Sequence, residues 1–165
     1  MKNILITGGG GYIGTNLTKE LLNEGYNVTV IDTFWFGNYL EKHKKLKIIK
    51  KDIRNISKKD LNKIDCIMHL ASIANDPAAE LDARLTWDVN VLATYKLINL
   101  AITQKVKKFI FASSGSVYGI KKEKKVVENL SLEPISEYNK SKMIGERVLL
   151  SYKKNIDITI LRPAT

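Results

Sequence analysis

The chain has 165 residues, of which 44% are hydrophobic and 27% are charged. These fractions are typical of one globular domain with a buried core, and they exclude a largely disordered chain. No apolar run approaches the roughly 20 residues that a membrane-spanning helix needs, so we expect no membrane partner. Cys66 is the single cysteine, which excludes a disulfide framework within the chain and favours a reducing, cytoplasmic location.

The net charge of +10 raises the question of nucleic-acid binding. However, 23 of the 27 basic residues are lysines, whereas nucleic-acid sites favour the planar fork of arginine. The densest lysine runs, residues 42–51 and 121–125, contain no aromatic side chains on which bases could stack. We therefore interpret the charge as a solvated surface and expect no nucleic-acid partner.

Six short runs rich in Ile, Val and Phe divide the chain. Each run is nearly continuous in apolar residues, which is typical of strands that are covered on both faces in a parallel sheet. The predicted strands are residues 3–7, 27–32, 46–49, 65–69, 108–113 and 156–161.

Segments with a helical spacing of apolar residues separate these runs. The first predicted helix ends near Gly25, a residue suited to a helix C-terminal cap. Further apolar spacing predicts a long helix over residues 80–105 and another over 137–154, whereas residues 42–45 are a poor helix and predict a loop. This alternation predicts an α/β fold built on a doubly wound, Rossmann-like parallel sheet.

A glycine-rich turn joins the first predicted strand to the first predicted helix. Gly8, Gly11 and Gly14 have the spacing G-x-x-G-x-x-G, and Tyr12 and Ile13 lie between the last two. Such a turn leaves a strand sharply, lets a diphosphate approach bare backbone, and aims the N–H groups of a helix N-terminus at the phosphates. The alternative is a merely flexible turn, but the strand before it and the helix after it favour dinucleotide binding.

Asp32 ends the second predicted strand, 18 residues after Gly14. A carboxylate near this position accepts hydrogen bonds from the adenosine ribose hydroxyls and repels a 2′-phosphate. Because no arginine follows it, the sequence favours NAD over NADP. An aspartate that only caps a helix or organises a loop is the alternative.

A second constellation lies in the C-terminal third of the chain. Tyr138 and Lys142 stand four residues apart, which on a helix places both side chains on one face. A lysine ammonium near a phenol stabilises the phenolate and lowers its pKa. Ser114 follows the fifth predicted strand, and ligands bind at the carboxyl ends of such strands.

With these motifs, the chain resembles the extended short-chain dehydrogenase/reductases, the NAD-dependent epimerase/dehydratase family that acts on nucleotide sugars. The matching segments are residues 7–14, 32, 51–54, 69–71, 90–94, 113–119, 138–142 and 161–163. The resemblance implies that Tyr138 is the catalytic base and acid. It implies that Lys142 holds the nicotinamide ribose and lowers the pKa of the tyrosine, and that Ser114 hydrogen-bonds the reacting sugar hydroxyl.

The resemblance also assigns roles around NAD. Asp52 and Ile53 would meet the adenine, and Leu70 and Ala71 would line the channel for phosphate and ribose. Asn90 would support the cofactor site through hydrogen bonds. Two other residues are interpreted as structural, His69 as a buried histidine satisfied by its neighbours and Cys66 as core, and no metal site is expected.

The activity implied is epimerisation of a nucleotide sugar, in which a hydroxyl at C4 is transiently oxidised and the hydride returns to the opposite face. Related dehydratases carry an Asp-Glu pair directly after the position of Ser114, and here Gly115 and Ser116 stand instead. Dehydration is therefore disfavoured. A nucleotide-sugar dehydrogenase or reductase, and an NAD-binding regulatory or scaffold protein, are the alternatives.

The resemblance implies that residues 1–165 form the NAD-binding domain with its catalytic residues, and that a substrate domain follows residue 165. We therefore expect the 165-residue chain alone to turn over a sugar poorly. A nucleotide sugar is the expected substrate, and a homodimer formed through the two long helices is the expected assembly.

Overall fold

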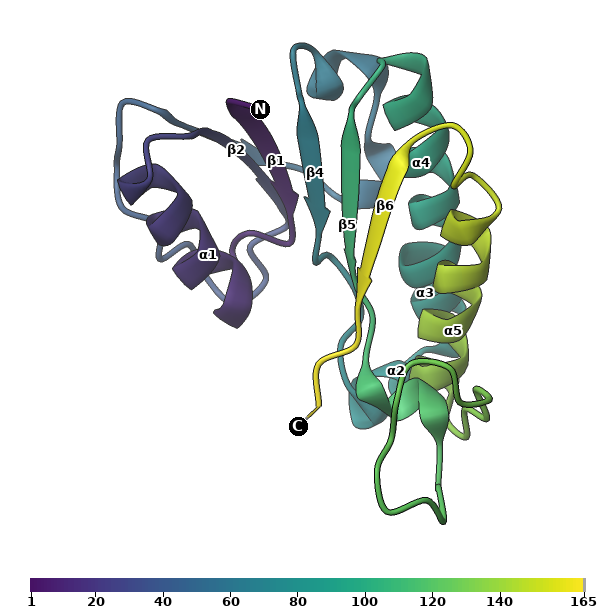
Figure 1. The fold of residues 1–165 in the computed structure, drawn as a ribbon. Helices are drawn as coiled ribbons and strands as arrows, with labels where there is room; N and C mark the ends of the chain where they lie inside the picture. Colours follow the sequence, from purple (N-terminus) through teal and green to yellow (C-terminus); the bar gives the residue numbers. More distant parts are fainter. Residues whose placement is uncertain (165) are drawn as a thin grey trace.

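One parallel sheet of six strands forms the centre of the computed structural model, which describes residues 1–164. The strands lie in the order β3-β2-β1-β4-β5-β6, so the winding reverses between β1 and β4 (Figure 1). In open α/β sheets, ligands bind at the carboxyl ends of the strands beside such a reversal. The strands are β1 (Asn3–Thr7), β2 (Asn27–Asp32), β3 (Leu46–Lys50), β4 (Cys66–His69), β5 (Lys108–Ala112) and β6 (Asp157–Leu161).

Helices cover both faces of this sheet. In Figure 1, α1 lies on one side beside β1 and β2, whereas α3, α4 and α5 lie on the other side. A π-helical turn, Asp88–Leu92, joins α3 to α4, and a 3-10 turn, Gly115–Tyr118, follows β5. The helices are α1 (Tyr12–Asn23), α2 (Asp76–Leu81), α3 (Ala83–Trp87), α4 (Ala93–Thr103) and α5 (Glu137–Leu150).

The side chains of β1 show why the strand runs are continuously apolar. Ile4 and Ile6 are buried on the face covered by α1, where Leu17 packs against the same cluster. Leu5, between them, is buried in the opposite cluster together with Leu97 of α4. Successive side chains of a strand point to opposite faces, so covering both faces requires every position to be apolar.

The predicted fold class is confirmed, and the predicted strands agree with the observed ones to within one residue at each end. The first helix ends at Asn23, and Gly25 follows with a φ of +85°. Within residues 1–164, no helix separates β2 from β3, as the lysine-rich residues 42–45 predict. The helix predicted over residues 137–154 is four residues shorter, because it ends at Leu150.

The long helix predicted over residues 80–105 is present from Ala83 to Thr103 as α3, the π-helical turn and α4 in succession, but its predicted start is wrong, because Glu80 and Leu81 belong to α2. Helical geometry is interrupted at Asp82 (φ −149°, ψ 89°), whose carboxylate accepts a hydrogen bond from Leu85 N, 2.9 Å away, to begin α3. Leu81 and Leu92 are 89% and 58% exposed, so they do not belong to one buried face. The apolar spacing predicted one helix because the sequence pattern does not reveal which apolar side chains are covered.

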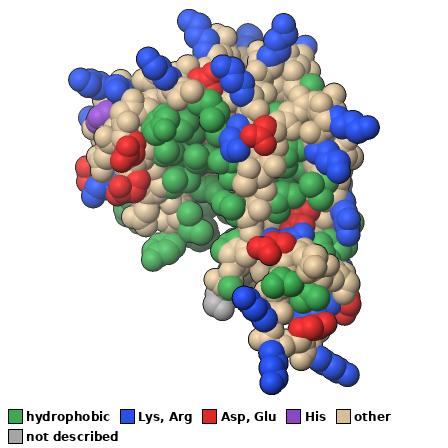
Figure 2. Space-filling view, viewed as in Figure 1, with side chains coloured by type: hydrophobic (Ala, Val, Ile, Leu, Met, Phe, Trp, Pro, Cys, Tyr) green, Lys and Arg blue, Asp and Glu red, His purple; other side chains and the backbone are tan. Residues whose placement is uncertain are grey.

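Charged side chains are spread over the surface. In Figure 2, lysine and arginine side chains stand out around the rim of the face shown rather than gathering in one patch, in line with a solvated basic surface. None of the helices in residues 1–164 combines the length and the apolar character that crossing a membrane requires.

Candidate functional site

A cavity of about 580 Å³ opens where the strands end at their carboxyl side. Its wall is built by the turn after β1, by the segments after β2, β3, β4 and β5, and by the first turns of α5. Figure 2 shows a hollow at this end of the sheet, flanked by hydrophobic side chains. The sequence-predicted site residues in the wall are Gly8, Gly11, Tyr12, Ile13, Gly14, Asp32, Asp52, Ile53, Leu70, Ala71, Ser114, Tyr138 and Lys142.

The glycine turn is tightly packed against the segment that follows β4. A Cβ atom on Gly8, whose φ is +75°, would lie 2.5 Å from Ala71 N. A Cβ atom on Gly14 would lie 2.4 Å from Gly8 O, so α1 approaches the turn closely only because this position has no side chain. Gly11 caps α1 without a side-chain hydrogen bond, so the helix N-terminus presents bare backbone to the cavity.

Asp32 is fixed by backbone donors on both sides. Its Oδ2 accepts a hydrogen bond from Gly10 N at 2.9 Å, and its Oδ1 accepts one from Phe34 N at 2.7 Å. The carboxylate therefore organises the loop after β2, which was the alternative to a cofactor-binding role, and it also lies in the cavity wall. Each carboxylate oxygen has a further lone pair, so binding a ribose hydroxyl remains compatible with both contacts.

Aromatic side chains directly after Asp32 form part of the wall that the sequence interpretation missed. Phe34, Trp35 and Phe36 line the cavity, and Trp35 and Phe36 are largely exposed. The run of three aromatic residues is the sequence signal for this part of the wall. Flat apolar side chains suit contact with an aromatic base.

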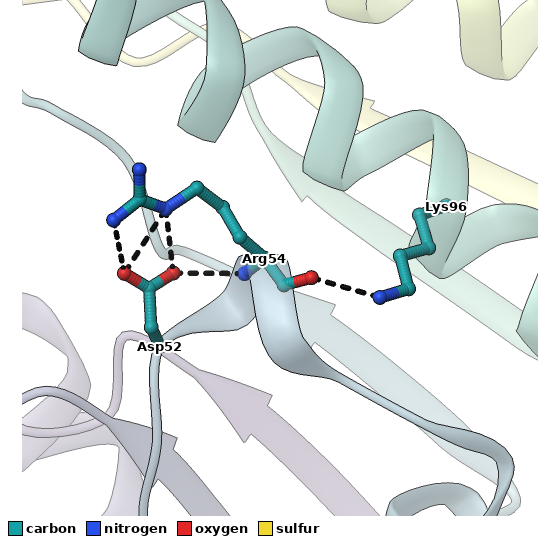
Figure 3. A network of polar contacts seen from close by, with 3 residues as sticks. All are labelled: Asp52, Arg54 and Lys96. Carbon is teal, nitrogen blue, oxygen red and sulfur yellow. Dashed lines mark hydrogen bonds and ion pairs between the residues drawn. The ribbon is translucent and has the colours of Figure 1, made fainter.

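The segment after β3 is held by an ion pair (Figure 3). Asp52 caps the 3-10 turn Ile53–Asn55 and accepts hydrogen bonds from both Nε and Nη2 of Arg54, the latter at 2.7 Å. These hydrogen bonds hold the pKa of Asp52 below its usual value. Lys96 of α4 donates to Arg54 O at 2.8 Å, which ties the turn to the helix layer. Asp52 is thereby kept ionised and fixed in the cavity wall.

Asn90 lies away from the cavity wall, buried in the π-helical turn. Its Oδ1 accepts a hydrogen bond from Ile73 N at 2.8 Å, and its Nδ2 donates to Ile73 O and to Ser141 Oγ. The side chain thus joins the segment after β4 to α5. This contact supports the shape of the site, whereas the structure does not bring Asn90 to the cavity itself.

Ser114, Tyr138 and Lys142 all line the cavity. Tyr138 and Lys142 lie one turn apart on α5, with Lys142 Nζ 5.7 Å from the centre of the Tyr138 ring. Lys142 Nζ also donates to Ala112 O, 2.9 Å away at the end of β5. This hydrogen bond holds α5 against the strand that leads into Ser114.

Burial controls the titration of both α5 side chains. It lowers the pKa of Lys142 to about 8 and raises the pKa of Tyr138 above its ordinary value. The Ser114 hydroxyl opposes the rise of the Tyr138 pKa by hydrogen bonding, whereas the negative charge of Asp76 adds to it. The expected lowering of the tyrosine pKa by Lys142 is therefore not what this structure gives, because desolvation of the phenolate is the larger effect.

His69 is structural, as its sequence interpretation states. The buried ring lies between two threonines, with Nδ1 2.6 Å from Thr7 Oγ1 and Nε2 2.8 Å from Thr94 Oγ1. Burial lowers the pKa of His69 to about 3, so the ring is neutral at pH 7. Cys66 is buried in the core. In residues 1–164, no group of three or more His, Cys, Asp or Glu side chains is arranged to hold a metal ion.

Comparison with known proteins agrees with this geometry. The family model of the NAD-dependent epimerase/dehydratase family matches residues 4–165. The chain belongs to this family.

The similar proteins include several 4-epimerases. A UDP-glucose 4-epimerase of Lactobacillus helveticus is 33% identical over 88% of this chain and 46% of its own length. The structure of a UDP-N-acetylglucosamine 4-epimerase from Methanobrevibacter ruminantium matches with a TM-score of 0.92 and 32% identity, over 98% of this chain and 54% of that one. The structure of a UDP-glucuronic acid 4-epimerase from Bacillus cereus, solved with UDP-glucuronic acid and NAD, matches with a TM-score of 0.89 and 36% identity, over 97% of this chain and 55% of that one.

Dehydratases are also among the solved relatives. The chain spans about half the length of the curated relatives that it matches. The family relationship therefore covers the sheet and the cavity described above.

NAD is the cofactor of this family, and the cavity fits it. The backbone of the glycine turn would hold the diphosphate, Asp32 the adenosine ribose, and Ile53 with the aromatic run the adenine. Lys142 and Tyr138 would meet the nicotinamide end. When bound, NAD would supply reversible two-electron oxidation, and the residues of this chain named above would bind and orient it.

Replacing Lys142 by methionine tests the buried charge. Below pH 8 the amine is charged in both states, and its burial lowers the free energy of unfolding. Between pH 8 and 10.5 the folded state has lost this proton but the unfolded chain still holds it, so the free energy of unfolding rises with pH until the penalty is gone. Lys142→Met should therefore raise the free energy of unfolding at pH 7 by about 1 to 3 kcal/mol and flatten its rise above pH 8.

Urea titrations of the wild type and the variant at pH 7 and above pH 9 measure this difference. Lys140→Met is the matched control, because Lys140 lies on the same helix with a side chain that is 45% exposed, and it should change stability little. A Lys142→Met variant that is less stable than the wild type at pH 7 would contradict the account.

Proposed function

We propose that the protein is a nucleotide-sugar 4-epimerase that uses bound NAD. The observation that carries the proposal is the convergence of Ser114, Tyr138 and Lys142 in the wall of a cavity that the glycine turn and Asp32 also line. The arrangement joins a cofactor site to a group that can exchange a proton with a sugar hydroxyl. The names of the similar 4-epimerases support the same proposal.

In the proposed reaction, Tyr138 takes the proton of the sugar hydroxyl as the carbon is oxidised, and later returns it. The Ser114 hydroxyl hydrogen-bonds the same sugar oxygen and so stabilises the charge that develops there. Lys142, buried and close to the phenol ring, favours the phenolate when it is charged. Reduction from the opposite face of the planar carbon then gives the epimer.

The segment after Ser114 supports epimerisation over dehydration. Gly115 and Ser116 stand at the two positions where related dehydratases carry an Asp-Glu pair. Ser116 Oγ lies 2.7 Å from Ser114 Oγ, so its hydroxyl hydrogen-bonds the proposed catalytic serine. Neither residue carries an acid or base that can eliminate water at neutral pH.

The direct test incubates the full-length protein, with any substrate domain that follows residue 165, with NAD and, separately, with UDP-glucose, UDP-N-acetylglucosamine and UDP-glucuronic acid. We expect proton NMR to show the C4 epimer of one of them with no net accumulation of NADH. Tyr138→Phe should lower turnover by about 10² to 10⁴-fold while NAD affinity changes by less than about threefold. Tyr152→Phe, which removes a hydroxyl just beyond the end of α5, is the control and should leave turnover unchanged.

Other results would contradict the proposal in different ways. Accumulation of NADH with an oxidised sugar indicates a dehydrogenase. Tight NAD binding with no turnover of any of the three sugars favours a regulatory or scaffold protein.

We also propose that the protein forms a homodimer through α4 and α5. The two helices lie side by side on one face of the sheet (Figure 1). Apolar side chains remain exposed on or beside them, with Leu92 at 58%, Tyr95 at 51% and Leu150 at 39%. The Tyr95 ring contacts the Tyr152 ring at 6.5 Å between centres, so the patch continues from one helix to the end of the other.

Sedimentation equilibrium tests this assembly. Tyr95→Glu should weaken the dimer by at least about tenfold, because it buries a charge in the interface. Tyr39→Glu is the control, since Tyr39 is also exposed but belongs to the loop after β2. A wild-type protein that sediments as a monomer would contradict the proposal.

A further inference from the structure

Glu146 is a buried carboxylate on α5 that the proposed reaction does not use. The residue has no exposed surface. It accepts hydrogen bonds from Arg162 Nε at 2.9 Å and Arg162 Nη2 at 2.6 Å, and a short one from Ser113 Oγ. An isolated buried carboxylate is strongly disfavoured, so this side chain depends on its two-pronged contact with the guanidinium.

Arg162 extends the contact to a third element. It follows β6, and its Nη1 donates to Tyr118 OH at 2.7 Å while the guanidinium lies 5.0 Å from the centre of the Tyr118 ring. Tyr118 ends the 3-10 turn that begins directly after Ser114. One ion pair therefore joins α5, the end of β6 and the segment that carries the proposed catalytic serine.

The same face of α5 contacts each of the two residues that precede Ser114. Lys142 Nζ donates to Ala112 O, and Glu146, one turn further along the helix, accepts from Ser113 Oγ. On the other side, β6 and the chain after it accept hydrogen bonds from the backbone on either side of the serine. Leu161 O, at the end of β6, accepts from Ser113 N at 2.8 Å, and Pro163 O accepts from Gly115 N at 2.9 Å. Ser114 is thus held between α5 and the end of β6.

We propose that the Glu146–Arg162 ion pair is a positioning element that holds Ser114 at its working distance from Tyr138. The proposal rests on the proposed function, because it gives Ser114 a reacting partner to be positioned against. A charged fork fixes both distance and direction, whereas apolar packing at the same place would allow the segment to slide. Displacement of a reacting group by about 1 Å can lower a rate by about 100-fold.

Amide hydrogen exchange tests the holding of the segment without any need for turnover. Glu146→Gln keeps the shape of the side chain but removes its charge, and Arg162→Lys keeps the charge but removes the fork. Both variants should speed exchange of the amides of residues 112–119 by at least about tenfold, with little change in β1. Asp157→Asn is the control, because the more exposed Lys108–Asp157 pair joins β5 to β6 at the ends opposite Ser113 and Arg162, with 2.8 Å between Nζ and Oδ2.

A double-mutant cycle tests whether Glu146 acts through Ser114. In the wild-type background, Glu146→Gln should lower kcat by about 10 to 100-fold with KM changed less than about threefold. In a Ser114→Ala background the same substitution should lower kcat by less than about twofold, because the group to be positioned is already gone. Asp157→Asn should leave kcat unchanged in both backgrounds.

The outcomes are separable. Exchange that stays at the wild-type rate in residues 112–119, or losses of kcat that multiply in the double variant, would overturn the positioning role. If the wild type binds NAD but epimerises no sugar, the proposed function fails, and hydrogen exchange alone then decides whether the ion pair holds the segment.

Discussion

The parallel sheet places the carboxyl ends of all six strands at one edge, and the site depends on this constraint. The turn after β1, the carboxylate at the end of β2 and the serine after β5 come from distant parts of the sequence. They line one cavity because each strand runs in the same direction as its neighbours. The reversal between β1 and β4 opens the sheet at the point where the glycine turn meets the segment after β4.

Several buried polar side chains lie near the carboxyl ends of the strands and contact the segments that line the cavity. Lys142 is buried beside an aromatic ring, and its hydrogen-bond acceptor is a backbone carbonyl at the end of β5. Glu146, one turn further along α5, is paired with Arg162. Groups of this kind contribute less to stability than apolar side chains of similar size, since desolvation offsets much of their attraction. Their concentration beside Ser114 and Tyr138 is typical of a site that trades stability for chemistry.

The sequence predicted the features that depend on local spacing. The strand runs, the glycine turn and Asp32 at a strand end each follow from residue types a few positions apart, and the structure agrees with them. His69 could be judged structural from its place in a buried strand, although its two partners, Thr7 and Thr94, lie far from it in the sequence and were not predicted.

Features that depend on distant contacts were not predictable. The break at Asp82 separates helices whose apolar side chains follow one helical spacing, and only the covered surface decides which of them are buried. The resemblance implied that Asn90 supports the site, but residue spacing could not show that its partners lie on the segment after β4 and on α5, away from the cavity wall. The raised pKa of Tyr138 depends on how deeply α5 buries the phenol, and residue spacing carries no information about that depth.

Titration calorimetry with NAD and NADP tests most directly the claim that this edge of the sheet is an NAD site selected by Asp32. We expect one NAD bound per chain and an affinity for NADP that is at least about tenfold weaker, because Asp32 repels a 2′-phosphate. Asp32→Asn should reduce the difference between the affinities for NAD and NADP. Equal affinities for the two cofactors, or no binding of NAD, would contradict the account.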